Sequence, residues 1–213
     1  MKYLRKYGLF ESNTDIDSIC QIYGIQNYTI NSDGTVDVDG DVSLSERNLS
    51  KLPLKFGRVT GSFNCSYNKL TTLEGCPREV GGGFYCDDNQ ITTLLGCPEY
   101  VRGNFYCHTN QLTTLRGCPR EVGGSFGCHK NQLTIINDEL EFVKIKRDFK
   151  IEDNPIYEVY KLFPDFESFK YSLDYNYFRA PNQIVKNRFE EACQEAGITV
   201  PEIIKRYQYI WNT

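Results

Sequence analysis

A phrase that recurs at a fixed 21-residue interval runs through the middle of this chain and constrains its fold more than any other feature. Three residue types return at this interval: Phe63, Phe84, Phe105 and Phe126, then Cys65, Cys86, Cys107 and Cys128, then Asn68, Asn89, Asn110 and Asn131. The triplet Gly-Cys-Pro also recurs, beginning at Gly75, Gly96 and Gly117. A repeat at a fixed interval is typical of a solenoid, in which each unit buries the same apolar face against the next. The sequence therefore predicts one elongated body of stacked rungs.

The repeat extends beyond its clearest copies at both ends. A degenerate first unit contains Val42 in the phenylalanine position and Arg47 in the asparagine position. A last unit contains Phe149 and Asn154 in these positions, after a two-residue insertion. These units predict about six parallel strands between residues 41 and 156. The segment after each Gly-Cys-Pro is too short for a helix, so we expect the returning arm of each rung to be extended or 3₁₀.

The N-terminal segment, residues 1–40, predicts a cap for this solenoid. Residues 13–24 carry apolar side chains at helical spacing and end at Gly24, which favours a short helix. Residues 28–38 alternate apolar and polar side chains around Asp33-Gly34, a strong signal for a β-hairpin.

The C-terminal segment, residues 157–213, predicts a second cap. Its composition becomes helical and aromatic, with candidate helices at 156–163, 166–177 and 181–197 and another that begins at Pro201. A helical cap would cover the apolar end of the stack. The expected fold class is α+β: a solenoid between an N-terminal helix-hairpin cap and a C-terminal helical cap.

Nine cysteines raise the question of disulfides. Their number is odd, the first residues contain no apolar core of signal-peptide length, and seven of the nine fall at repeat positions. We expect those seven to be reduced core residues of a cytoplasmic protein. No apolar run approaches the length of a membrane span, so no membrane association is expected.

The strand of each unit carries a family resemblance. The pattern Phe84-x-Cys86-x-x-Asn89-x-Ile91 has the spacing L-x-L-x-x-N-x-L of leucine-rich repeats. Over residues 42–156 the chain resembles that family, in a short 21-residue variant, and its Gly-Cys-Pro phrase is similar to that of uncharacterised bacteriophage and bacterial proteins. The resemblance implies a protein-binding scaffold, and for a bacteriophage protein an inhibitor or sequestering protein that acts on a host factor in the host cytoplasm.

Outward side chains of the strands are the candidates for binding, because strand side chains alternate between the two faces of a sheet. They vary between rungs, whereas the inward residues do not. The predicted binding residues on the concave strand face are Asn64, Tyr85, Asp87, Asn104, Tyr106, His108, His129 and Lys150. Tyrosines on a shallow polar face are typical interface anchors, although an aromatic ladder can also simply stabilise a sheet.

No catalytic, metal or cofactor motif stands out, so no enzyme is expected. Asp37, Asp39 and Asp41 alternate like calcium ligands, but a calcium loop would need glycine where Val42 stands. Asp87, His108 and His129 would form a flat row, a poor tetrahedral metal site.

Charge limits the kind of partner. The formal charge is −4 and no segment is basic, which argues against a long nucleic acid as partner. A protein partner of unknown identity is the leading prediction. The alternative is a small ligand or a short single-stranded nucleic acid stacked on the tyrosines.

Overall fold

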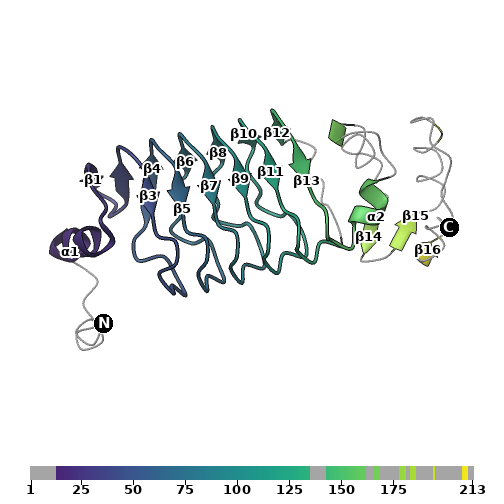
Figure 1. The fold of residues 1–213 in the computed structure, drawn as a ribbon, viewed down its shortest axis with the longest axis horizontal. Helices are drawn as coiled ribbons and strands as arrows, with labels where there is room; N and C mark the ends of the chain where they lie inside the picture. The colour runs from purple at the N-terminus through teal and green to yellow at the C-terminus, as the bar shows by residue number, and fades with distance from the viewer. Residues whose placement is uncertain are drawn as a thin grey trace.

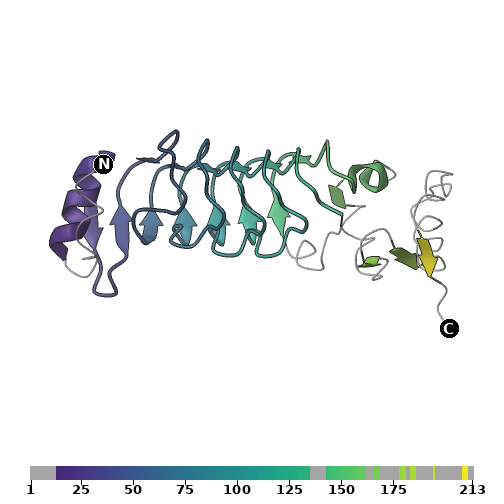
Figure 2. The ribbon, with the colours of Figure 1, turned by 90° about the horizontal axis from the view of Figure 1, so that it is seen from below.

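The computed structural model describes residues 13–134, 143–161, 166–167, 178–180, 183–185, 194 and 208–210. Its central part is a β-solenoid of parallel strands with a 21-residue period (Figures 1 and 2). Each rung contributes one short strand to each of two sheets, which we call sheet A and sheet B. The rungs are stacked along the long axis of the molecule, and helix α1 (Asn13–Tyr23) lies at the N-terminal end of the stack.

Sheet B contains the strands that the repeat predicts. Its six strands are β3 (Val42–Ser43), β5 (Phe63–Asn64), β7 (Phe84–Tyr85), β9 (Phe105–Tyr106), β11 (Phe126–Gly127) and β13 (Phe149–Lys150), and each pair of neighbours is parallel. Phe63 pairs with Phe84, as the 21-residue interval predicts. Phe126 pairs with Phe149, as predicted from the two-residue insertion before the last unit. The six predicted parallel strands are confirmed.

Sheet A was not predicted beyond its N-terminal hairpin. It joins β1 (Tyr28–Ile30), β2 (Val36–Val38), β4 (Phe56–Val59), β6 (Glu79–Val80), β8 (Tyr100–Val101), β10 (Glu121–Val122) and β12 (Lys144–Ile145). Apart from the antiparallel β1–β2 pair, its strands are parallel. From β2 to β10, each strand of this second sheet has a valine that points into the core, such as Val80 or Val101.

The core is a column of identical residues. The rings of Phe63, Phe84 and Phe105 stack at centroid distances of 5.7 and 5.5 Å with interplanar angles of 8° and 10°, and all three are fully buried. The ring of Phe126 then turns edge-on to Phe105, at 4.9 Å and 77°. Buried aromatic pairs in such offset or edge-on arrangements contribute beyond the area they bury, which explains why phenylalanine recurs at this position.

An asparagine closes the strand end of each rung. The Nδ2 of Asn89 donates to the carbonyl oxygens of Cys65, Cys86 and Asp87, and its Oδ1 accepts from the amide of Leu70. The corresponding side chains of Asn110, Asn131 and Asn154 make the same kinds of bonds and are likewise buried. The predicted asparagine ladder is confirmed, except that Asn68 is only partly buried because the first rung, with Arg47, gives it less cover.

The residue before each asparagine lies in the left-handed region of backbone space. Tyr67, Asp88, Thr109, Lys130 and Asp153 have φ between 52° and 55°. Non-glycine residues adopt this conformation at a cost. The recurrence in five consecutive rungs shows that the turn between strand and asparagine imposes it.

The returning arm of each rung contains no helix within the described residues, as predicted. It ends in a turn at Gly-Cys-Pro, where the amide of Cys97 donates to the carbonyl of Leu94 at 3.0 Å. Gly96 has φ +90°, and a side chain there would meet the carbonyl oxygen of Leu73. Only glycine fits both constraints.

The N-terminal cap has the predicted helix and hairpin. Helix α1 buries Ile19 and Cys20 in the same apolar core as the rungs, and Tyr28 on β1 donates a hydrogen bond of 2.6 Å to Asp17 on the helix. Strand β2 pairs with β4, so the hairpin extends sheet A by two strands.

At the C-terminal end, helix α2 (Tyr157–Tyr160) lies within the predicted helix 156–163, and Phe149 of the last rung packs on Tyr160 and Phe166. The helix predicted to begin at Pro181 is wrong at its start. Residues Gln183–Val185 form strand β15, which pairs with β14 (Phe178–Ala180) and β16 (Gln208–Ile210). The β-branched Ile184 and Val185 favour a strand over a helix.

The helix predicted to begin at Pro201 is also wrong at its described residues, because Gln208–Ile210 form strand β16. The rest of the helices predicted after residue 167 lies outside the described residues, apart from Gln194, which is helical. No helix in the part of the chain that the structure describes is long and apolar enough to span a membrane.

Candidate binding face

The outward side chains of sheet B, together with the residue that follows each inward cysteine, form one surface, which we call the sheet B face. Tyr85, Asp87, Tyr106, His108 and His129 lie next to one another at its centre. Five of the eight predicted binding residues are therefore brought together.

The two tyrosines lie on neighbouring rungs. Their ring centroids are 5.6 Å apart and the planes are inclined by 53°. The ring of Tyr85 lies over Gly83, and that of Tyr106 lies against Gly127 of the next rung, as shown by the contacts that a side chain at either glycine would make. Both tyrosines are half-buried, and burial raises the pKa of Tyr85. Each ring thus covers a glycine backbone and remains partly exposed to solvent.

Two histidines continue the aromatic row. The ring of His108 lies 6.0 Å from that of Tyr106 and stacks on His129 at 4.3 Å with an interplanar angle of 19°. Burial, with a smaller contribution from His108, lowers the pKa of His129. Four rings therefore run across three rungs in the order Tyr85, Tyr106, His108, His129.

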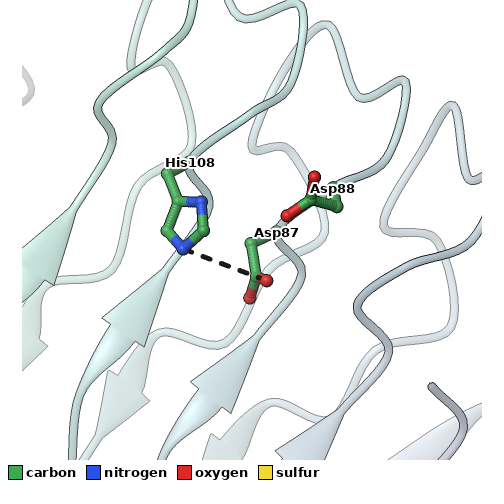
Figure 3. Close-up of side chains that lie close together, drawn as sticks. All are labelled: Asp87, Asp88 and His108. Atoms are coloured by element: carbon green, nitrogen blue, oxygen red, sulfur yellow. Dashed lines mark ion pairs between the residues drawn. The ribbon is translucent and has the colours of Figure 1, made fainter.

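Asp87 is the most buried ionisable side chain of this face. Its side chain is 10% exposed, and its Oδ2 lies 3.9 Å from Nε2 of His108 (Figure 3). Burial raises the pKa of Asp87, and His108 opposes that shift. Asp88 stands beside this pair, and one ligand atom from each of Asp87, Asp88 and His108 fits within 4.8 Å of the others. These are the described residues that could hold a metal ion.

Two other predicted site residues are engaged in hydrogen bonds within the protein. The Oδ1 of Asn64 accepts from the amide and hydroxyl of Ser66, and that of Asn104 accepts from the amide of Ser125 at 2.9 Å. Lys150 is exposed on the last rung, separated from Tyr106 by Gly127. These three residues flank the centre of the face.

The acidic run near the N-terminus has a structural function instead. The carboxylates of Asp37 and Asp41 accept hydrogen bonds from the amides of Arg58 and Ser62, and that of Asp39 accepts from the hydroxyl of Thr60. Each acceptor lies 21 residues before its donor. The run therefore joins two rungs.

A second outward surface, on sheet A, was missed by the sequence reasoning. Tyr100 is 39% exposed there, and ion pairs join neighbouring rungs, among them Arg58 to Glu79 at 3.8 Å and Glu121 to Lys146 at 3.0 Å. The charged side chains and Tyr100 border a shallow depression of about 510 Å³. The signal was present in the sequence, because Arg58, Glu79, Tyr100 and Glu121 occupy the same position of successive repeats.

Comparisons with known proteins returned nothing: no protein-family model matches this chain, and neither does any curated protein or solved structure.

Proposed function

We propose that this chain is a leucine-rich-repeat scaffold that binds a protein partner through the sheet B face without catalysing a reaction. The observation that carries the proposal is the row of four aromatic rings, from Tyr85 to His129, on one regular sheet surface. Partly exposed tyrosines give contact area at low entropic cost and are enriched in interface hot spots. The spacing of the asparagine ladder supports the family assignment.

The rigidity of the surface supports the same use. Each rung is tied to the next by strand pairing and by the bonds of one buried asparagine, such as Asn89 or Asn110. A preorganised surface loses little conformational entropy on binding. The finer proposal, that the partner is a host factor which a bacteriophage protein sequesters, rests on the resemblance of the Gly-Cys-Pro phrase.

The test is affinity capture from bacterial lysate with three proteins: wild type, the Tyr85→Ala/Tyr106→Ala double variant and Tyr100→Ala. The last variant removes an exposed tyrosine from sheet A and is the matched control. We expect a stoichiometric protein that the wild type and Tyr100→Ala retain and the double variant loses, once thermal unfolding shows that all three are folded. No stoichiometric protein, or one lost only with Tyr100→Ala, contradicts the proposal.

The same aromatic row favours a second candidate, a planar ligand or a short single-stranded nucleic acid stacked on Tyr106 and His108. Stacking on aromatic side chains binds bases without sequence preference. Fluorescence anisotropy with labelled oligonucleotides at low salt tests it. Binding that weakens steeply with added salt supports this candidate, and no binding at low salt removes it.

A further inference from the structure

The carboxylate of Asp87 has an unusual environment for an acidic group. The residue is 7% exposed, and among the described residues no hydrogen bond from another residue reaches the carboxylate. Its nearest charged or chargeable partner is the imidazole of His108, at 3.9 Å, which is longer than a hydrogen bond. A buried carboxylate that only its own backbone amide stabilises is costly unless a cation compensates it.

A second carboxylate and an imidazole face the same place. Figure 3 shows the side chains of Asp87 and His108 pointing toward each other from neighbouring rungs, with the carboxylate of Asp88 beside them. Ligand atoms of the three groups lie within 4.8 Å of one another. Since bonds from a transition metal to nitrogen or carboxylate oxygen are about 2.0–2.2 Å long, side-chain movements of roughly 1 Å bring all three onto one ion.

We propose that Asp87, Asp88 and His108 form a binding site for a divalent transition-metal ion of the Zn²⁺ type. One imidazole nitrogen and two carboxylates are ligands that suit such ions. Ca²⁺ and Mg²⁺ fit less well, because they take six or more oxygen ligands. Three protein ligands leave a position for water or for a group of a bound partner.

The backbone holds the three ligands in place. The carbonyl oxygens of Asp87 and His108 accept hydrogen bonds from the buried amides of Asn89 and Asn110. Asp88 lies between Asp87 and Asn89 in the sequence and has φ 52°. Its side chain is therefore not part of the flat row that is formed by the residues directly after the cysteines. A flat row of Asp87, His108 and His129 is a poor tetrahedral metal site. The set with Asp88 is a better one, because the turn at Asp88 adds a ligand from outside that row.

The orientation of His108 also fits a ligand. Its Nδ1 lies 3.1 Å from the hydroxyl oxygen of Thr109, and its Nε2 faces Asp87. Metal-binding histidines commonly engage the other ring nitrogen in a hydrogen bond, which fixes the ring. His129 stacks on the face of the His108 ring and is not part of the proposed ligand set.

The experiment uses the full chain, freed of metal with a chelator and kept reduced. Isothermal titration with ZnCl₂ measures affinity and stoichiometry for the wild type, Asp87→Asn, Asp88→Asn and His108→Gln. The control is Asp153→Asn, because Asp153 precedes Asn154 with φ 55° as Asp88 precedes Asn89, but is exposed on the last rung. We expect one ion per chain for the wild type and the control, and at least tenfold weaker binding for each of the other variants.

A second readout separates this site from the cysteines. Co²⁺ bound by nitrogen and oxygen gives visible d–d absorption without the near-ultraviolet charge-transfer band of a cobalt thiolate. We expect the former in the wild type and its loss in His108→Gln, with thermal unfolding showing that the variant is folded. A thiolate band, no binding of either ion, or binding that all three substitutions leave unchanged would each overturn the proposal.

Discussion

The side-chain amide of Asn89 donates a hydrogen bond to the carbonyl oxygen of Cys65, which lies 24 residues earlier and one rung away, at 3.0 Å. Through its other bonds the same side chain closes the turn of its own rung and accepts from Leu70. One amide therefore satisfies buried backbone groups of two units. In a solenoid the interfaces between neighbours carry much of the stability, so this contact is where we expect substitution to be most damaging.

Replacing Asn89 by alanine should destabilise the solenoid by about 1–3 kcal/mol, because buried carbonyls and an amide lose their partners. For a chain of this size, each kcal/mol lowers the thermal midpoint by about 2–4 °C. Asn68→Ala should cost less, since Asn68 is only partly buried next to the first rung. Circular dichroism melts of both variants compare them, and equal losses would show that cover by the neighbouring rung is unimportant.

Replacing Tyr85 by alanine should cost less than replacing Asn89. The ring covers Gly83 but leaves no buried polar group unsatisfied when it is removed. A cross-strand aromatic pair contributes about 0.2–1 kcal/mol. If urea unfolding shows Tyr85→Ala to be as destabilising as Asn89→Ala, the tyrosine row is structural and the proposed binding face loses its main support.

Replacing Lys130 by asparagine should stabilise the protein. Lys130 is exposed and has φ 53°, a conformation that costs most non-glycine residues about 1–2 kcal/mol and that asparagine tolerates better. We expect a gain of roughly 0.5 kcal/mol, a fraction of that cost. Lys69→Asn is the control, because Lys69 is also exposed but lies outside the left-handed region. A gain of the same size in both variants would refute the backbone explanation.

The inward thiols should react slowly in the native state. Burial raises the pKa of Cys86, Cys107 and Cys128 well above the ordinary value, so at pH 8 they contain less thiolate than an unfolded cysteine does. At each pH between 7 and 9 their labelling should therefore be much slower than that of the same cysteines in denaturant. None of the described cysteines forms a disulfide. Mass spectrometry after timed alkylation measures each site, and rapid native labelling of these three would contradict their burial.

The repeat by itself determined the stacking of sheet B. Because every rung must bury the same side chains against its neighbours, the repeat interval fixes which residues pair, and Phe63 does meet Phe84 in the structure. The asparagine bonds and the non-helical returning arm follow from the same sequence, since residue type and segment length leave few alternatives there. Five of the eight predicted face residues come together for this reason.

Only the tertiary structure decided the remaining features. The strands of sheet A are mostly two residues long, too short for an alternating pattern to be read, and they exist because neighbouring rungs supply their hydrogen-bond partners. The approach of Asp88 to Asp87 and His108 depends on a left-handed backbone at residue 88 and on the adjacent rung. In the C-terminal region, residues 183–185 pair with Gln208–Ile210, a segment distant in the sequence. Local sequence reports the preferences of a segment, whereas these contacts depend on which distant segment lies beside it.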